Sequence, residues 1–493
     1  MNAKSPLDPD TSAALLDLVR ERATRYLESL PERPVFPRVG PDDLRARLDG
    51  PLPETGQAPA EVLRRLADAG DAAAVASAGP RYFGFVIGGA LPVALGADWL
   101  TSVWDQNAGL YVAAPVPTVA EEVAARWLLE LFGLPARSSV GFVTGGQMAN
   151  FTCLAAARHA VLRRSGWDVE RDGLQGAPRV RVVAGEEAHV TIHGALQMLG
   201  LGSGAIVAVP TDGQGRVDAA RLRDALRGHD GPTIVCAQAG NVNTGAVDPL
   251  AEVIDAAHEG EAWVHVDGAF GLWAAASPRR RPLLAGVERA DSWATDAHKW
   301  LNVPYDCGLA IVAHPEAHFG AMSLKAEYLE KSDGTARDPL DWTPEFSRRG
   351  RGVAVWAALA SLGRDGVAAI VDRCCDHAAQ FAERLAGGPG IEVLNEVVLN
   401  QVLVRFHPDS GDEPAADAPG ADAPGADAPG ADALTREVIR RVQEDRVCWL
   451  SGTRWQGRDA MRISVANWST TVADVERSVD SIRRSCLAAR AMR

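Results

Sequence analysis

Apolar residues recur along this chain with two different spacings, and the two spacings alternate from about residue 120 onward. Short, nearly continuous apolar runs bounded by Gly, Pro, Asn or Asp are typical of buried strands, whereas apolar positions three and four residues apart are typical of amphipathic helices. Strands that alternate with crossover helices predict a mainly parallel, doubly wound α/β sheet. The predicted order is helix 118–132, strand 139–144, helix 147–164, strand 179–184, helix 190–200, strand 204–208, strand 233–237, helix 249–258, strand 262–267, strand 292–295 and strand 308–313.

Two further regions flank this sheet. The N-terminal residues 1–78 have helical periodicity at 11–30 and 59–69, with a proline-rich stretch between them. They hold too few apolar positions for a core of their own, so we expect them to pack on another domain or another subunit. At the other end, a helical pattern over 352–386 leads into a smaller α/β unit, for which we predict strand 400–406, helix 434–445, strand 460–465 and helix 472–488.

A low-complexity insert, residues 413–433, interrupts the C-terminal unit. The pentapeptide Ala-Asp-Ala-Pro-Gly occurs in it three times in succession, over residues 416–430. Such a repeat of small and charged residues cannot bury a core. We therefore expect a disordered, solvent-exposed loop.

Composition narrows the class of protein. The 493 residues are 47% hydrophobic and 23% charged, which is typical of a soluble globular protein with more than one domain. A net charge of −14 argues against a nucleic-acid-binding surface. The seven cysteines are scattered and odd in number, which favours free thiols in the reducing cytoplasm. No segment approaches the roughly 20 uninterrupted apolar residues of a membrane span, and residues 1–10 lack a signal core, so we expect a cytoplasmic protein.

Asp267 and Lys299 are the first candidates for chemistry. Asp267 ends the predicted strand 262–267, and Lys299 follows between the rings of His298 and Trp300, where we expect its amine to be shielded from water. Enzymes that use pyridoxal 5′-phosphate (PLP) need such a pair. A lysine amine holds the cofactor aldehyde as a Schiff base, and a carboxylate keeps the pyridinium nitrogen protonated. The pair therefore predicts PLP as the cofactor.

A glycine turn supplies the second requirement, a phosphate site. Gly145 and Gly146 lie between the strand 139–144 and the helix 147–164. Free amides at the start of a helix attract a dianion, and glycines let the backbone approach it closely. Gln147 can add a side-chain hydrogen bond. Ligands of doubly wound sheets bind at the carboxyl ends of strands, where this turn, Asn241 and Asp267 all fall.

Histidines allow a second hypothesis beside PLP. His189 opens the helix 190–200 and is positioned to stack on a pyridine ring. Zinc is the rival, because His193 lies on the same helix face as His189, and His265 lies on the same strand face as Asp267. The histidine pair lacks a Glu directly after His189 and has no third ligand nearby in the sequence. For His265 and Asp267, a strand-end carboxylate near a reactive lysine suits a pyridinium partner better. Stacking is therefore the favoured interpretation, and no metal is expected.

These motifs resemble one family. The chain is similar to the PLP-dependent group II amino-acid decarboxylases, which include glutamate and aromatic L-amino-acid decarboxylases of fold type I. The likeness spans roughly residues 80–385 and is strongest in Thr144-Gly145-Gly146, Ala188-His189, Ala239-Gly240-Asn241, His265-Val266-Asp267-Gly268-Ala269 and Asp296-Ala297-His298-Lys299-Trp300. It implies a large PLP-binding domain with a seven-stranded sheet over residues 79–385, a small C-terminal domain over 386–493, and an N-terminal segment, 1–78, that packs on the dimer partner.

The resemblance also implies roles for individual residues. Lys299 would bond to PLP, Asp267 would pair with the pyridinium nitrogen, and His189 would stack on the ring. The remaining cofactor contacts would come from Gly145, Gly146, Gln147, Asn241, Ala269 and His298. Tyr328, in the polar loop 323–342, would protonate the carbon that has lost CO2, and this loop would reach the active site of the partner in a homodimer.

The implied reaction is decarboxylation of an L-amino acid to an amine and CO2. Substrate contacts are expected from Tyr82, Phe83, Trp104 and Asn107, but both acidic and aromatic amino acids stay open as substrates. Gly79-Pro80 stands where many members of the family have His-Pro. Three other PLP reactions stay open: transamination, aldol cleavage and aldehyde-forming oxidative decarboxylation, the last of which Tyr328 argues against. A PLP-binding protein without turnover is the remaining hypothesis.

Overall fold

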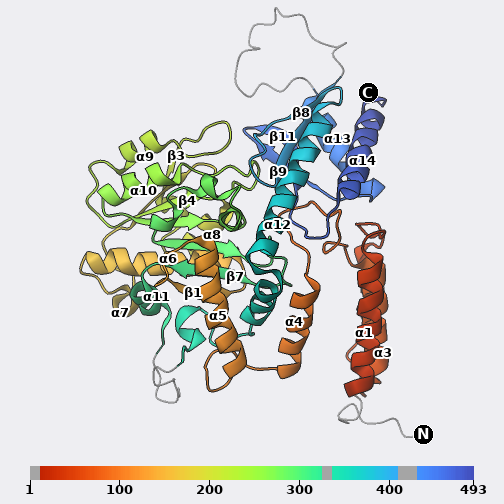
Figure 1. Ribbon diagram of the computed structural model, residues 1–493, viewed down its shortest axis with the longest axis horizontal. Helices are drawn as coiled ribbons and strands as arrows, with labels where there is room; N and C mark the ends of the chain where they lie inside the picture. The colour runs from red at the N-terminus through yellow and green to blue at the C-terminus, as the bar shows by residue number, and fades with distance from the viewer. Residues whose placement is uncertain (1–11, 325–335, 409–429, 493) are drawn as a thin grey trace, which may run out of the picture.

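The computed structural model describes residues 12–324, 336–408 and 430–492. A large α/β domain, a smaller C-terminal domain and a separate N-terminal pair of helices are visible in Figure 1, where α1 and α3 lie side by side at one edge of the molecule. The helices are α1 Ser12–Ser29, α2 Pro41–Leu48, α3 Pro59–Ala73, α4 Pro92–Trp104, α5 Pro115–Phe132, α6 Gly146–Arg164, α7 Val169–Asp172, α8 Val190–Met198, α9 Ala219–Leu226, α10 Leu250–Glu259, α11 Pro315–Met322, α12 Gly352–Ala386, α13 Ala431–Asp445 and α14 Val472–Arg490.

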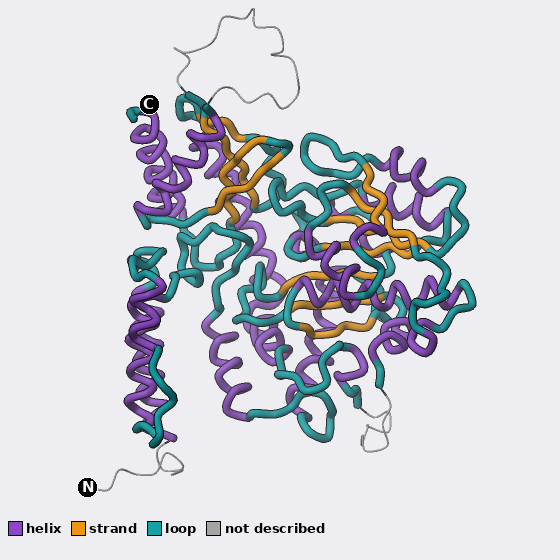
Figure 2. The backbone as a smooth tube through the Cα atoms, turned by 180° about the vertical axis from the view of Figure 1, so that it is seen from behind, coloured by secondary structure: helices purple, strands orange, loops and turns teal. Residues whose placement is uncertain are grey.

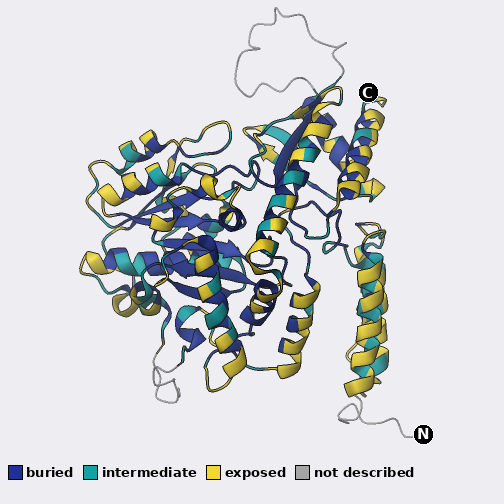
Figure 3. Ribbon diagram, in the orientation of Figure 1, coloured by how far each residue is buried: buried dark blue, intermediate teal, exposed yellow. Residues whose placement is uncertain are grey.

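The large domain is built on the predicted seven-stranded sheet. Its order is β1-β7-β6-β5-β4-β2-β3, and β7 alone runs antiparallel to its neighbours within the described residues. Most of these strands are buried on both faces, which is why they read as continuous apolar runs (Figure 3). The strands are β1 Ser139–Val143, β2 Arg181–Gly185, β3 Ile206–Val209, β4 Thr233–Gln238, β5 Trp263–Asp267, β6 Ser292–Asp296 and β7 Gly308–Val312.

Helices cover both faces of this sheet. One face packs on α6, α8 and α11, and the other on α5, α9, α10 and α12. Because successive strand residues point to opposite faces, Val264 and Val266 of β5 join the second core, whereas Trp263 joins the first. His265 and Asp267 share the face of Trp263 and so point towards α6.

The C-terminal domain holds a four-stranded antiparallel sheet in the order β10-β11-β9-β8. Figure 2 shows its strands as a group separate from the larger sheet. Its strands are β8 Ile391–Val393, β9 Gln401–Phe406, β10 Ser451–Trp455 and β11 Arg458–Ser464. Helix α12 joins the two domains. It is long and apolar enough to cross a membrane by length and composition, but most of its buried apolar residues belong to the principal core, the one that contains Val264 and Val266.

Several sequence-based boundaries need correction. The predicted helix 352–386 is interrupted at Gly363, whose φ of 59° lies outside the helical region. Residues 203–205 form a 3₁₀ turn, so the strand expected at 204–208 begins at Ile206. Helix α13 begins at Ala431, which makes the last three residues of the predicted insert helical. The rest of that insert up to residue 429, and Tyr328, lie outside the described residues.

Candidate active site

The residues predicted to bind the cofactor lie at the carboxyl ends of β1, β2, β4, β5 and β6. Asp267 is the last residue of β5, and Asp296 is the last residue of β6, three residues before Lys299. The glycine turn follows β1, and His189 follows β2. This is the edge at which open α/β sheets bind their ligands.

Lys299 lies in a turn that is held by hydrogen bonds to Cys307, the residue before β7. Ala297 N and His298 N both donate to Cys307 O. The amine of Lys299 lies 2.8 Å from Asp296 Oδ2, and the side chain of Lys299 is 21% exposed. The expected shielding is therefore only partial, and a buried carboxylate rather than an apolar wall is its nearest partner.

Asp267 is held in place by both of its oxygens. Oδ2 accepts a hydrogen bond from Asn150 Nδ2 at 3.2 Å, and Oδ1 accepts one from the backbone N–H of Ala269 at 3.2 Å. The residue is only 6% exposed. The two donors fix the position of this buried carboxylate, which is suited to pair with a pyridinium nitrogen.

The start of α6 has no side-chain cap, although the Asp296 carboxylate lies beside its first turn. Gly145 occupies the N-cap position and no side chain caps the first amides. Close packing requires glycine on the opposite strand, because a Cβ on Gly308 would come within 2.5 Å of the Gly145 carbonyl carbon. Gln147 of the first turn donates a long hydrogen bond of 3.4 Å to Thr191 O, which ties α6 to the start of α8. The turn can therefore receive a phosphate with several free N–H groups.

Two histidines flank this turn, and burial lowers the pKa of both. His189 Nδ1 lies 2.8 Å from Thr191 Oγ1 and accepts from Thr191 N at 3.3 Å. His298 Nδ1 accepts from Cys307 N at 3.1 Å, and its ring stacks on Tyr305 at 4.2 Å. With Nδ1 used as an acceptor, each neutral imidazole carries its proton on Nε2. Among residues 12–324, 336–408 and 430–492, no three His, Cys, Asp or Glu side chains are grouped as metal ligands.

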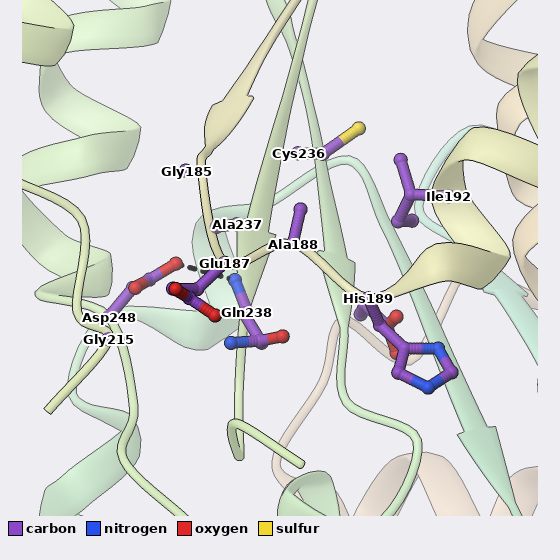
Figure 4. Close-up of a pocket in the computed structure, with 11 residues that line it drawn as sticks. Gly185, Glu187, Ala188, His189, Ile192, Gly215, Cys236, Ala237, Gln238 and Asp248 are labelled. Atoms are coloured by element: carbon purple, nitrogen blue, oxygen red, sulfur yellow. Dashed lines mark hydrogen bonds between the residues drawn. The ribbon is translucent and has the colours of Figure 1, made fainter. Parts of the chain in front are cut away.

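A small cavity lies beside His189, between the ends of β2 and β4 (Figure 4). Its volume is about 10 Å³, the lower limit for one water molecule. Asp248 forms one wall, where it accepts hydrogen bonds from Val217 N and Gln238 N, and burial raises its pKa to about 6. Nearby, the buried Asn241 Nδ2 has no hydrogen-bond partner in the described part of the chain, so it is free to donate to a bound ligand.

The four residues predicted to contact substrate do not share one environment. Tyr82 stacks on Trp449 with ring centroids 5.1 Å apart, whereas Phe83 packs edge-on against Phe381 in the principal core. Trp104 ends α4 and is exposed. Asn107 Oδ1 accepts from the backbone N–H of Arg348 at 3.1 Å. Phe83 therefore supports the wall that Tyr82 belongs to and does not line the site itself.

Two features of the site were missed by the sequence analysis. One is an aromatic cluster in which Tyr82 and Phe85 both contact Trp449, close to Tyr305 over His298. The other is Arg462 of β11, a nearly buried guanidinium whose charge helps to lower the pKa of His189. Its Nη1 donates to Val242 O at 3.2 Å, its Nε has no partner among the described residues, and burial lowers its pKa to about 10. The available signal was Arg462 standing between the apolar Met461 and Ile463 of β11.

The residues present fit PLP. They offer an amine for the aldehyde, a carboxylate for the ring nitrogen, an uncapped helix start for the phosphate and an amide at Asn241 without a partner among the described residues. Known proteins agree with this assignment. The profile of the pyridoxal-dependent decarboxylase conserved domain matches residues 41–407, well over half of the chain.

Individual relatives cover most of the chain. Tryptophan decarboxylase 1 of Oryza sativa subsp. japonica is 30% identical over 94% of this chain and 91% of its own length. L-2,4-diaminobutyrate decarboxylase of Rhizobium meliloti (strain 1021) is 30% identical over 74% of this chain and 72% of its own. The crystal structure of Oryza sativa TDC with PLP and tryptamine superposes with a TM-score of 0.88 at 26% identity, covering 98% of this chain and 99% of that one. The chain belongs to the pyridoxal-dependent decarboxylase family and is a PLP-dependent carboxy-lyase of amino acids.

Proposed function

We propose that this enzyme decarboxylates an aromatic L-amino acid, with Lys299 and Asp267 as the two principal PLP-binding residues. The observation that carries the proposal is the convergence of the Lys299 amine, the Asp267 carboxylate and the open start of α6 at one edge of the sheet. When bound, PLP supplies an electron sink for the electron pair left on Cα as CO2 departs.

The chain's own residues position the reactants. Lys299, now paired with Asp296, would hold the cofactor through its amine, and Asp267 would hold the proton of the ring nitrogen. His189 covers one face of the ring as a neutral imidazole. Gly145, Gly146 and Gln147 bind the phosphate, beside His298.

The substrate assignment rests on the aromatic cluster and on Arg462. Tyr82, Phe85 and Trp449 offer flat apolar surfaces, which suit an aromatic side chain, and Tyr82 lies near Tyr305, which stacks on His298. Arg462 enters from the C-terminal domain as a desolvated cation and is suited to orient a carboxylate. An acidic amino acid is the rival substrate, because its second carboxylate could use the same arginine. The relatives named above act, by their names, on tryptophan and on 2,4-diaminobutyrate, so the family leaves the side chain open.

Tyr328 is proposed as the proton donor to Cα. The proposal rests on its position in a sequence that resembles the family's mobile-loop tyrosine, since Tyr328 lies outside the described residues. Replacing it with phenylalanine keeps the ring and removes the proton. We expect Tyr328→Phe to form much less amine per CO2 released. A wild-type yield of amine from this variant would contradict the proposal that Tyr328 is the proton donor.

We propose a homodimer with the site at the subunit interface. Helix α4 exposes Trp99, Leu100 and Val103, and no residue of α1 is buried within one chain. Exposed apolar surface of this kind marks an interface. Light scattering of the wild type should give twice the mass of one chain. The double variant Leu100→Glu with Val103→Glu should have a measured mass closer to that of a single chain. Leu487→Glu, on exposed α14, is the matched control. A monomeric wild type would contradict the proposal.

A cytoplasmic location is also proposed. All seven cysteines are free and buried, as expected for a protein that folds in a reducing compartment. Cell fractionation with a labelled chain tests this, and recovery in a secreted fraction would contradict it.

The main experiment separates cofactor binding from turnover. Purified wild type with PLP should show a visible absorption band that Lys299→Ala lacks, and a screen of the twenty amino acids should release CO2 from an aromatic one. Product identification distinguishes an amine from an aldehyde or a keto acid. PLP binding without CO2 release from any amino acid would contradict decarboxylation, and preference for glutamate or aspartate would contradict the aromatic assignment.

A further inference from the structure

His265 is a buried histidine behind the site that the proposed function does not use. It lies two residues before Asp267 on β5, is fully buried and faces α6. Its Nε2 is 2.9 Å from Asn150 Oδ1 on α6, and its Nδ1 is 3.0 Å from Ser292 Oγ on β6. The ring therefore connects three elements that shape the site.

The hydrogen bonds around His265 have one consistent direction. Asn150 Oδ1 can only accept, so the Nε2 of His265 must carry a proton. Burial lowers the pKa of His265 to about 4, which keeps the ring neutral and leaves Nδ1 as an acceptor. Ser292 donates its hydroxyl proton to that nitrogen, while its oxygen accepts from Trp263 Nε1 at 2.9 Å. The hydrogen bonds that link Trp263, Ser292, His265 and Asn150 thus all donate in the direction of Asn150.

The same direction continues into the site through the amide of Asn150. Because its oxygen faces His265, its nitrogen faces Asp267 Oδ2 at 3.2 Å and Thr191 Oγ1 at 3.0 Å. Thr191 Oγ1 accepts that bond and has its own proton left for His189 Nδ1, 2.8 Å away. The orientation of the Asn150 amide therefore affects both Asp267 and His189, the residues assigned to the cofactor ring.

We propose that His265 is a positioning residue for PLP: its Nε2–H fixes the amide of Asn150, which orients Asp267 beneath the ring nitrogen and sets the tautomer of His189. The inference rests on the proposed roles of Asp267 and His189. Without His265, the buried Asn150 Oδ1 loses its donor, and rotation of the amide would turn that oxygen towards a carboxylate. Either change disturbs Asp267.

Matched substitutions of two buried histidines test the proposal. His265→Leu removes the donor, whereas His265→Gln can place an amide N–H close to the position of Nε2. His318 is equally buried but bonds Ser139 and Trp342, away from this series, so His318→Leu reports the general cost of losing a buried histidine. We measure the PLP dissociation constant and the visible absorption spectrum of each holoenzyme, and how that spectrum changes with pH.

We expect His265→Leu to bind PLP about 10-fold more weakly, with an altered spectrum, a loss equivalent to about 1.4 kcal/mol. His265→Gln should recover most of the affinity, and His318→Leu should lower stability without changing the spectrum. A folded His265→Leu protein with wild-type affinity and spectrum would overturn the inference. Failure of the wild type to bind PLP would instead count against the proposed function.

If His265→Leu does not fold, the proton itself can be located. Neutron diffraction, or nitrogen NMR of the wild type labelled in histidine, identifies which ring nitrogen of His265 is protonated. A proton on Nε2 alone supports the proposal. A proton on Nδ1 alone overturns it, because Asn150 would then have to present its oxygen to Asp267.

Discussion

Lys299 Nζ lies 2.8 Å from Oδ2 of Asp296, a carboxylate that is only 1% exposed. The pair stands at the first turn of α6, since a Cβ on Gly146 would come within 2.7 Å of the same oxygen. Asp296 Oδ1 accepts no hydrogen bond from the described residues. A negative charge thus occupies the helix end that favours a phosphate dianion, and it holds the amine that must bond to the aldehyde.

Asp296→Asn should therefore strengthen PLP binding. The substitution removes both the ion pair that Lys299 must break and the repulsion of the incoming phosphate. We expect a rise of about 10-fold in affinity, equivalent to about 1.4 kcal/mol, and faster association. Stopped-flow absorbance and equilibrium dialysis measure the two quantities. Asp306→Asn removes a nearby charge that is paired with Arg351 and serves as the control. Weaker binding by Asp296→Asn would show that the carboxylate assists the cofactor.

Gly308→Ala should weaken PLP binding by about 10-fold or more. The added Cβ would meet the backbone of Gly145 at 2.5 Å, so the turn that receives the phosphate must move. Gly70→Ala in α3 has no atom within 4 Å of the new Cβ and is the matched control, with a gain of about 0.5–1 kcal/mol in stability. Wild-type PLP affinity in a Gly308→Ala protein would mean that the turn tolerates displacement.

The large sheet could be predicted from the sequence because most of its strands are buried on both faces and form apolar runs. The strands that escaped prediction lack this signal. β8 has only three residues, and in β10 Gly452 and Arg454 are exposed. Helix α4 escaped for a different reason: it exposes apolar residues such as Leu100 and Val103, so its sequence lacks the polar face of an amphipathic helix.

Within the site, local motifs were predictable and long-range contacts were not. Lys299 and the glycine turn lie at the same edge because each follows the carboxyl end of a strand, β6 and β1, and only the antiparallel β7 separates these two strands. Arg462 reaches the site from another domain, and the contact of Asn150 with His265 depends on how α6 packs on β5. Tyr82 and Phe83 were both expected to contact substrate, yet Phe83 packs on Phe381 in the core, a long-range contact that the sequence does not show.

Removing either partner of the Arg348–Glu121 ion pair should destabilise the large domain by about 3–5 kcal/mol. The pair is bidentate and buried, and Arg348 also donates to Phe142 O of β1 at 2.8 Å. Urea unfolding of Glu121→Gln and Arg348→Met measures the loss. The exposed pair of Arg384 and Glu476 is the control, for which Glu476→Gln should cost at most about 1 kcal/mol. Equal effects at the two pairs would contradict the role of burial.

Stability should fall with acid through the buried histidines. Burial lowers the pKa of His318 to about 3, against about 6.5 in an unfolded chain. As the pH falls below about 6.5, His318 becomes protonated in the unfolded chain, whereas in the folded protein it stays neutral until about pH 3. The free energy of unfolding then drops by about 1.4 kcal/mol per pH unit for this group. His318→Gln should reduce the slope by that amount.

Asp248 should produce the opposite slope over part of the same range. Burial raises its pKa to about 6, so between about pH 6 and about pH 4 the folded protein binds a proton that the unfolded chain does not. Acid therefore adds stability through Asp248, and Asp248→Asn should make the fall of stability with acid steeper by about 1.4 kcal/mol per pH unit. Urea unfolding of both variants across this range measures the two slopes. Slope changes of the same sign in His318→Gln and Asp248→Asn would contradict the burial of one group or the other.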